Sequence, residues 1–158
     1  MKNEADRINN YDCTEDVLKH RALVGKYMAM IGAELTRRAA THDDSKLLYP
    51  EKLVFDEFTP KLQTLTYGSD EYKQALVDMG SGLRAHYQAN DHHPEHYHDG
   101  INGMTLLALA EMVCDWMAAS EAKGTVVNVD MQSKRFEITA QLKSIITNTV
   151  KWLEVAHE

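Results

Sequence analysis

The chain has 158 residues, 44% hydrophobic and 26% charged, a composition typical of a globular protein with room for a sizeable core. Its 24 acidic and 17 basic residues give a formal net charge of −7 without a basic stripe, so duplex nucleic acid is not an expected partner. No CxxC pair, secretory signal or apolar run of the roughly 20 residues that span a bilayer is present, so we expect a cytoplasmic protein without membrane partners.

The first predicted helix begins at Thr14 and ends near Arg38. The Thr14 hydroxyl can cap it, two acidic residues follow at the positive end of its dipole, and apolar residues then recur at helical spacing. A short helical segment is predicted over 41–46. Pro50 then opens a further helix that ends near Phe58, because proline is tolerated at a first helical position.

Residues 59–68 are predicted to form a loop, since a proline and a glycine punctuate them. Ser69 caps the next predicted helix, which covers 69–90. Gly80 and Gly82 weaken this helix locally and indicate close packing against a neighbour.

The segment 90–103, NDHHPEHYHDGING, contains a proline and glycines that exclude a regular helix. Residues 104–123 form the most apolar predicted helix, with Gly124 as its C-terminal cap. Valines within 126–129 could be extended but have no partner strand, and the last predicted helix covers about 133–156.

These elements predict an all-α fold of five to six helices with essentially no sheet. We expect a single domain over 1–158, with a core of about 14–122 followed by the C-terminal helix of about 133–156. No repeat or low-complexity tract divides the chain, and the sequence leaves open whether the protein is a homo-oligomer.

Side chains that suit a divalent cation lie on separate predicted helices. Neutral imidazole and carboxylate are ligands of zinc, iron, manganese and related ions, and packed helices can direct them to one point. The candidates in the helices are His20, His42, Asp43, His86 and Asp115. For a single member, the alternative is a satisfied core histidine or a polar helix cap.

Asp115 is the most informative of these positions, because it lies in the apolar segment LLALAEMVCDWMAA with Glu111 one turn earlier. An unpaired buried carboxylate costs roughly several kcal/mol or becomes protonated, so two acids on this helix need a cation or donors. A metal site supplies what they need. The alternative is that this face is exposed or that the acids accept from Arg or Lys.

The order of His20, the segment HDDSK at 42–46 and Asp115 resembles the HD superfamily of metal-dependent phosphohydrolases. In that superfamily a histidine, an adjacent His-Asp pair and a distal aspartate on helices surround one divalent ion. The resemblance covers about 17–120 and implies an HD-type helical bundle with an ion held by His20, His42, Asp43 and Asp115.

A closer similarity joins HDDSK, Glu51, AHYQANDHHPEHY and EMVCDW to an uncharacterised HD-like family found in phage and bacterial genomes. Lys46 resembles a lysine that HD-GYP phosphodiesterases and di-iron HD oxygenases place beside a metal ligand. His86, His92 and His93 resemble the histidines that hold a second metal there. The GYP element is absent, so the number of ions, one or two, stays open.

The resemblance implies hydrolysis of a nucleotide or another small phosphate ester as substrate. A divalent ion (Mn, Co, Ni, Zn, Fe or Mg) would polarise a phosphoryl oxygen and activate a bound water. Lys46 and His86 would stabilise charge or protonate the leaving oxygen, and Glu51 or Glu111 would orient the water or a ligating histidine. The alternatives are a di-iron HD-type oxygenase and a non-catalytic metal-binding protein.

Overall fold

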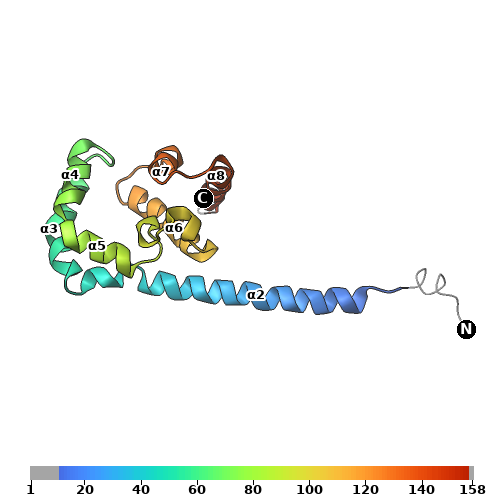
Figure 1. Ribbon diagram of the computed structural model, residues 1–158. Helices are drawn as coiled ribbons and strands as arrows, with labels where there is room; N and C mark the ends of the chain where they lie inside the picture. The colour runs from blue at the N-terminus through green and yellow to red at the C-terminus, as the bar shows by residue number, and fades with distance from the viewer. Residues whose placement is uncertain (1–10, 157–158) are drawn as a thin grey trace, which may run out of the picture. The chain divides into compact units, whose positions relative to one another are not determined.

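The computed structural model describes residues 11–156, which form seven α-helices and three short 3-10 helices (Figure 1). Within this range no strand is found, so the all-α prediction is confirmed. None of the helices in the described range is long and apolar enough to cross a bilayer. The chain divides into two compact units between Arg38 and Ala39, and each is described by itself. The expectation of a single domain stays a prediction.

The first unit consists of the greater part of helix α2, Thr14–Thr41. The helix begins at the predicted residue, where the backbone N–H and the hydroxyl of Thr14 both donate to Asp12 Oδ1, at 2.9 and 2.6 Å. Ion pairs one turn apart support its surface, among them Lys19 Nζ to Glu15 Oε1 at 2.7 Å. The helix ends a few residues later than predicted, inside the second unit.

The turn after α2 consists of His42 and Asp43, and the φ of Asp43, 60°, lies in the left-handed region. This conformation ends α2 and leads into the 3-10 helix η1, Asp44–Leu47. Helix α3, Glu51–Thr64, follows Pro50 as expected. It continues through Pro60, so the predicted loop over 59–68 is wrong in its first half. The reason is that the half-buried apolar stripe of α3 continues past the proline to Leu62.

The predicted helix over 69–90 is two helices, α4 (Asp70–Asp78) and α5 (Gly80–Ala89). The Ser69 side chain caps α4 by accepting from the Tyr72 N–H at 3.1 Å. The interruption falls at Gly80, whose φ of +56° no regular helix has. Close packing is confirmed at Gly82, because a Cβ there would lie 2.5 Å from Val54 Cγ2 on α3. At Gly80 the same prediction is wrong, because nothing lies within 4 Å of its Cβ position.

The histidine-rich segment contains the 3-10 helices η2 (Pro94–His96) and η3 (Gly100–Gly103) and no α-helix, as expected. Helix α6, Leu106–Glu121, follows, and the Thr105 hydroxyl caps it by accepting from the Ala108 N–H at 3.1 Å. Gly124 ends this region in the left-handed conformation, with a φ of 65°.

The predicted last helix over 133–156 is wrong as a single element. The chain forms α7, Val129–Arg135, and α8, Ala140–Val155. Glu137 separates them with a φ of 53°, which no regular helix accommodates. The valines considered as an extended piece form no strand in the described range, and Val129 opens α7.

Helices α6 and α8 are neighbours (Figure 1), and the core of the second unit lies between them. This position explains why α6 is the most apolar helix. Trp116 of α6 stacks on Phe136, with ring centroids 5.9 Å apart and planes within 4° of parallel. The buried apolar cluster consists of Met112, Val113, Trp116, Ile138, Ile146 and Val150. Two acids of α6, Glu111 and Asp115, instead contact His42 in the turn after α2.

Candidate metal centre

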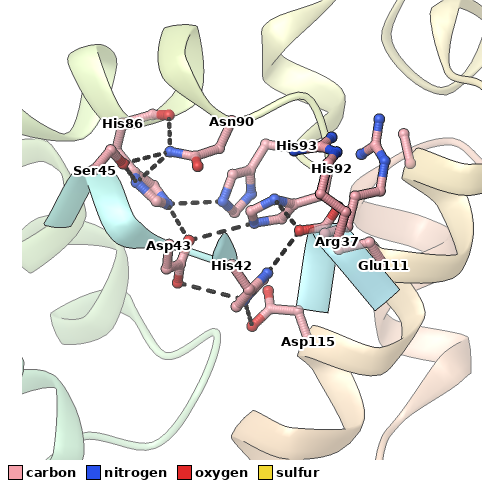
Figure 2. Close-up of polar contacts among 12 residues, drawn as sticks. Arg37, His42, Asp43, Ser45, His86, Asn90, His92, His93, Glu111 and Asp115 are labelled. Atoms are coloured by element: carbon pink, nitrogen blue, oxygen red, sulfur yellow. Dashed lines mark hydrogen bonds and ion pairs between the residues drawn. The ribbon is translucent and has the colours of Figure 1, made fainter. Parts of the chain in front are cut away.

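Histidines and acids from three parts of the second unit meet at one place (Figure 2). His42 and Asp43 come from the turn after α2. His86 comes from α5, and His92 and His93 come from the segment that follows it. Glu111 and Asp115 come from α6. Two groups have ligand atoms within 4.8 Å of one another: the first is His42, His92 and Asp115, and the second is Asp43, His86, His92 and His93.

The first group is built around His42. Its Nε2 lies 3.5 Å from Asp43 Oδ2 and 3.7 Å from Asp115 Oδ1. Its Nδ1 lies 2.8 Å from Glu111 Oε1. The Glu111 carboxylate accepts the proton that Nδ1 carries and so fixes the orientation of the ring, with Nε2 facing the other two acids.

The second group is built around Asp43 Oδ1. His86 Nε2 and His92 Nε2 each lie 3.5 Å from this oxygen, and His86 Nε2 lies 2.8 Å from His93 Nε2. Asp43 Oδ1 and His92 Nε2 are buried and have no hydrogen-bond partner among the described residues. Buried polar atoms are almost always satisfied, so this pair fits a bound cation better than it fits an empty polar pocket.

A hydrogen-bond network fixes His86 through its Nδ1 atom and its backbone carbonyl. Its Nδ1 lies 2.9 Å from Glu51 Oε2, which also accepts from the Ser45 hydroxyl at 2.7 Å. The Asn90 amide donates to the Ser45 hydroxyl at 2.7 Å and to the His86 carbonyl at 2.8 Å. Sequence reasoning named Glu51 but missed Ser45 and Asn90. The signals were the position of Ser45 inside HDDSK and the spacing of Asn90, one turn after His86.

Lys46 neutralises Asp43, which belongs to one group and lies beside His42 of the other. Its Nζ lies 2.5 Å from Asp43 Oδ2 and 4.8 Å from the centre of the Phe55 ring. Burial raises the pKa of Asp43, but Lys46 and then His42 lower it, and the net result is a pKa below the usual value. Asp43 is therefore an ionised carboxylate at neutral pH, which is the form that binds a cation.

The histidines of the centre differ in protonation. Asp115 and then Glu111 raise the pKa of His42 to about 9 by hydrogen bonding, against an opposing effect of burial. Burial lowers the pKa of His86 and His92. Burial, together with the neighbouring His92 and His86, lowers the pKa of His93 to about 3. Three imidazoles are thus neutral at pH 7, as ligation requires.

A cavity of about 760 Å³ adjoins the centre. Lys46, His86, His93 and Asp115 all line it, so the centre has an open side. Pockets for small molecules usually have volumes of about 300–1,000 Å³. A purely structural metal site is closed by its protein ligands. The open side therefore gives a small molecule access to the residues of the centre.

The remaining predicted residues are placed as follows. His20 lies in the second turn of α2, in the first unit, so its ligation stays a prediction. His96 and His98 are exposed, as expected from their places in the loop, and His98 is 99% exposed at its side chain. Of the paired histidines, both His92 and His93 face the centre, where at least one was expected.

Comparison with known proteins gives a family but no activity. The model of a family of unknown function, DUF5662, matches residues 9–157. Neither a curated protein nor a solved structure matches the chain. The chemistry of the protein therefore has to be inferred from the centre and from the cavity beside it.

Proposed function

The chain belongs to the DUF5662 family, and we propose that it is a metal-dependent phosphohydrolase of the HD type, acting on a nucleotide or another small phosphate ester. One observation carries the proposal. A half-buried, ionised Asp43 lies among four imidazoles, has a buried oxygen without a hydrogen-bond partner among the described residues, and belongs to a centre with one open side.

The donor set fits a divalent cation of the first transition row. His42, Asp43 and Asp115 would hold one ion, and His86, His92 and His93 supply the nitrogen-rich side. Imidazole and carboxylate suit manganese, cobalt, nickel, zinc and iron better than they suit calcium. Such an ion supplies Lewis acidity and lowers the pKa of a bound water.

The chain's own residues would position the substrate. Lys46 lines the cavity, and its ammonium could move from Asp43 to a phosphoryl oxygen of the substrate. Its positive charge would there stabilise the negative charge that develops in the transition state. His93 also lines the cavity and could contact the substrate there. Glu111 and Glu51 hold the rings of His42 and His86 in one orientation and one tautomer.

The test is release of phosphate from a panel of nucleotides and sugar phosphates with manganese, cobalt or nickel present. The wild-type protein should turn over at least one ester, and Asp43→Asn should abolish that turnover. His98→Gln is the matched control, because His98 is exposed and lies outside both ligand groups. Equal phosphate release by the wild type and Asp43→Asn would refute the proposal.

A second candidate, a di-iron oxygenase, draws support from the position of Asp43. Its two oxygens face different histidines: Oδ2 is near His42, and Oδ1 is near His86 and His92. A carboxylate placed between two donor groups suits two ions. Protein expressed with iron would then contain two irons per chain and consume oxygen with substrate. One metal per chain without oxygen uptake would leave the hydrolase.

A third candidate, a protein that uses the metal for folding alone, predicts a closed site. The 760 Å³ cavity lined by Lys46, His86, His93 and Asp115 argues against it. A metal site that only stabilises the fold does not require an ammonium group in an adjoining cavity. Removal of the metal tests this candidate, because a folding role predicts that the metal-free protein is unfolded.

A further inference from the structure

The cavity beside the metal centre has a second polar region that the proposed reaction does not use. It is formed by residues of the loop before α4, of α4, of the turn after α6 and of α7. Its members are Tyr67, Tyr72, Lys123, Gln132 and Arg135. None of them belongs to either group of potential metal ligands.

Arg135 is the fixed centre of this region. Its Nη1 donates to the Tyr67 hydroxyl at 2.6 Å, and its Nη2 lies 3.0 Å from Glu95 Oε1. The guanidinium also lies over the Phe136 ring, with Cζ 4.6 Å from the ring centre. A guanidinium has five N–H donors in one plane, so these contacts leave donors for a further oxyanion.

Lys123 adds a second positive charge next to the same tyrosines. Its Nζ lies 5.6 Å from the centre of the Tyr72 ring, and the rings of Tyr72 and Tyr67 lie 4.9 Å apart. No acidic side chain in the described range is bonded to Lys123. Its ammonium donates a long hydrogen bond, 3.4 Å, to the Leu62 carbonyl. A chain with a formal net charge of −7 thus places two cations in one part of a cavity wall.

A single side chain connects this region to the metal centre. The Tyr87 ring lies 5.0 Å from the His93 ring, and the Tyr87 phenol interacts with Arg135. Trp116 also lines the cavity, directly after Asp115 in the chain, and stacks on Phe136 beneath Arg135. A single small molecule can therefore reach both the metal centre and Arg135, with its middle part against an aromatic wall.

We propose that Arg135, assisted by Tyr67 and Lys123, binds a second oxyanionic group, a carboxylate or a phosphate, of the molecule whose ester lies at the metal centre. The placement of the ester at the metal centre rests on the proposed function, whereas the anion site itself does not. The substrate class is then a phosphate ester that carries a separate anionic group. Arginine suits this task, because its planar fork matches both oxyanions in a bidentate way.

The anion site is tested in metal-free protein, so that neither ligation nor turnover enters the result. Trp152→Phe leaves Trp116, which is 8% exposed and lines the cavity, as the fluorescent reporter. Inorganic phosphate and succinate are titrated separately to distinguish the two oxyanions. Saturable fluorescence change with either one is expected, and Arg135→Gln should weaken it at least about tenfold.

Three further variants make the result specific. Arg84→Gln removes the same charge from an exposed position outside the cavity and should leave binding unchanged. Glu95→Gln removes the competing carboxylate and should strengthen binding. Tyr67→Phe keeps the ring and should weaken binding less than Arg135→Gln does, and it replaces that variant if circular dichroism shows Arg135→Gln to be unfolded.

The proposal is overturned if neither anion binds. It is also overturned if Arg135→Gln binds the anion as tightly as Arg84→Gln and the wild type do. Loss of binding in Lys46→Met with normal binding in Arg135→Gln would also overturn it, since the anion would then lie at the metal end. Phosphate or succinate binding that depends on Arg135, in a protein that hydrolyses no ester, would refute the proposed reaction and leave the anion site standing.

Discussion

Asp115 Oδ1 lies 3.7 Å from His42 Nε2, although the two residues come from a central helix and from the turn after α2. A carboxylate on the most apolar helix thus has a polar partner. The same helix contributes Glu111 to the other nitrogen of the ring, at 2.8 Å. Glu111 and Asp115 therefore serve the centre, and these two acids do not mark an exposed helix face.

The hydrogen bonds behind the histidines should control metal affinity. Glu111→Gln weakens the acceptor at His42 Nδ1, and we expect a loss of about 10–100-fold in affinity for manganese or zinc. Glu121→Gln, an exposed acid of the same helix, should have no effect. Competition with a chelating dye measures both. Equal affinities in the two variants would show that Glu111 does not position the ring.

Lys46 should matter for turnover and not for metal content. Lys46→Met removes the ammonium that lies 2.5 Å from Asp43 Oδ2 and lines the cavity. If the protein hydrolyses phosphate esters, kcat should fall by about 10²–10³, the usual effect of removing one charge-stabilising donor. Metal analysis of the same sample provides the control. Loss of the ion together with the activity would contradict this prediction, because it would show that Lys46 is needed for metal binding.

Acid should destabilise the metal-free protein through its buried histidines. The folded pKa of His93 is about 3, below the unfolded value of 6.5, so the unfolded chain binds the proton more readily. The contribution of His93 is present above pH 6.5 and is lost as the pH falls toward 3. Urea unfolding should show a shallower acid decline in His93→Gln than in His98→Gln. Parallel declines in the two variants would contradict this.

His42 should have the opposite pH dependence. Its folded pKa of about 9 lies above the unfolded 6.5, so the native state binds the proton more tightly. The stability that this gives is complete below pH 6.5 and is lost as the pH rises through about 9. In the metal-free wild type, the free energy of unfolding should decline over this window, and His42→Gln should remove the decline. A decline that persists in His42→Gln would have another source.

Packing between α3 and α5 should be sensitive to one methyl group. A Cβ at Gly82 would lie 2.5 Å from Val54 Cγ2, so Gly82→Ala should reduce the free energy of unfolding by about 1–3 kcal/mol. Gly25→Ala is the matched helical control, because nothing lies within 4 Å of its Cβ position. Adding Val54→Ala to Gly82→Ala should restore part of the loss. Urea denaturation measures all three, and an unaffected Gly82→Ala would contradict the contact.

The chemical pattern of the sequence predicted most of the centre, because ionisable residues on apolar helices have few other uses. Asp115 was found in this way, whereas the His42–Asp43 pair was found by its resemblance to the HD motif, and the structure brings the three residues together. The ligation of His20 stays a prediction. Hydrophobic periodicity likewise predicted an all-α fold and the approximate places of most helices, since it depends on the residues of each helix alone.

The breaks between helices could not be predicted, because single backbone conformations decide them. Gly80 and Glu137 have positive φ values that periodicity does not reveal, whereas Pro60 lies inside a helix despite its usual effect. The anion site around Arg135 was equally hidden. Its residues come from separate elements, and no short motif joins Tyr67 to Arg135.

The left-handed backbone of Asp43, with a φ of 60°, determines how its substitutions must be interpreted. Aspartate and asparagine tolerate this conformation, whereas alanine in it costs roughly 1–2 kcal/mol. An alanine scan at this position would therefore confuse a poorly folded turn with a missing ligand. Asparagine keeps the turn and removes the negative charge, so it is the substitution that reports on ligation.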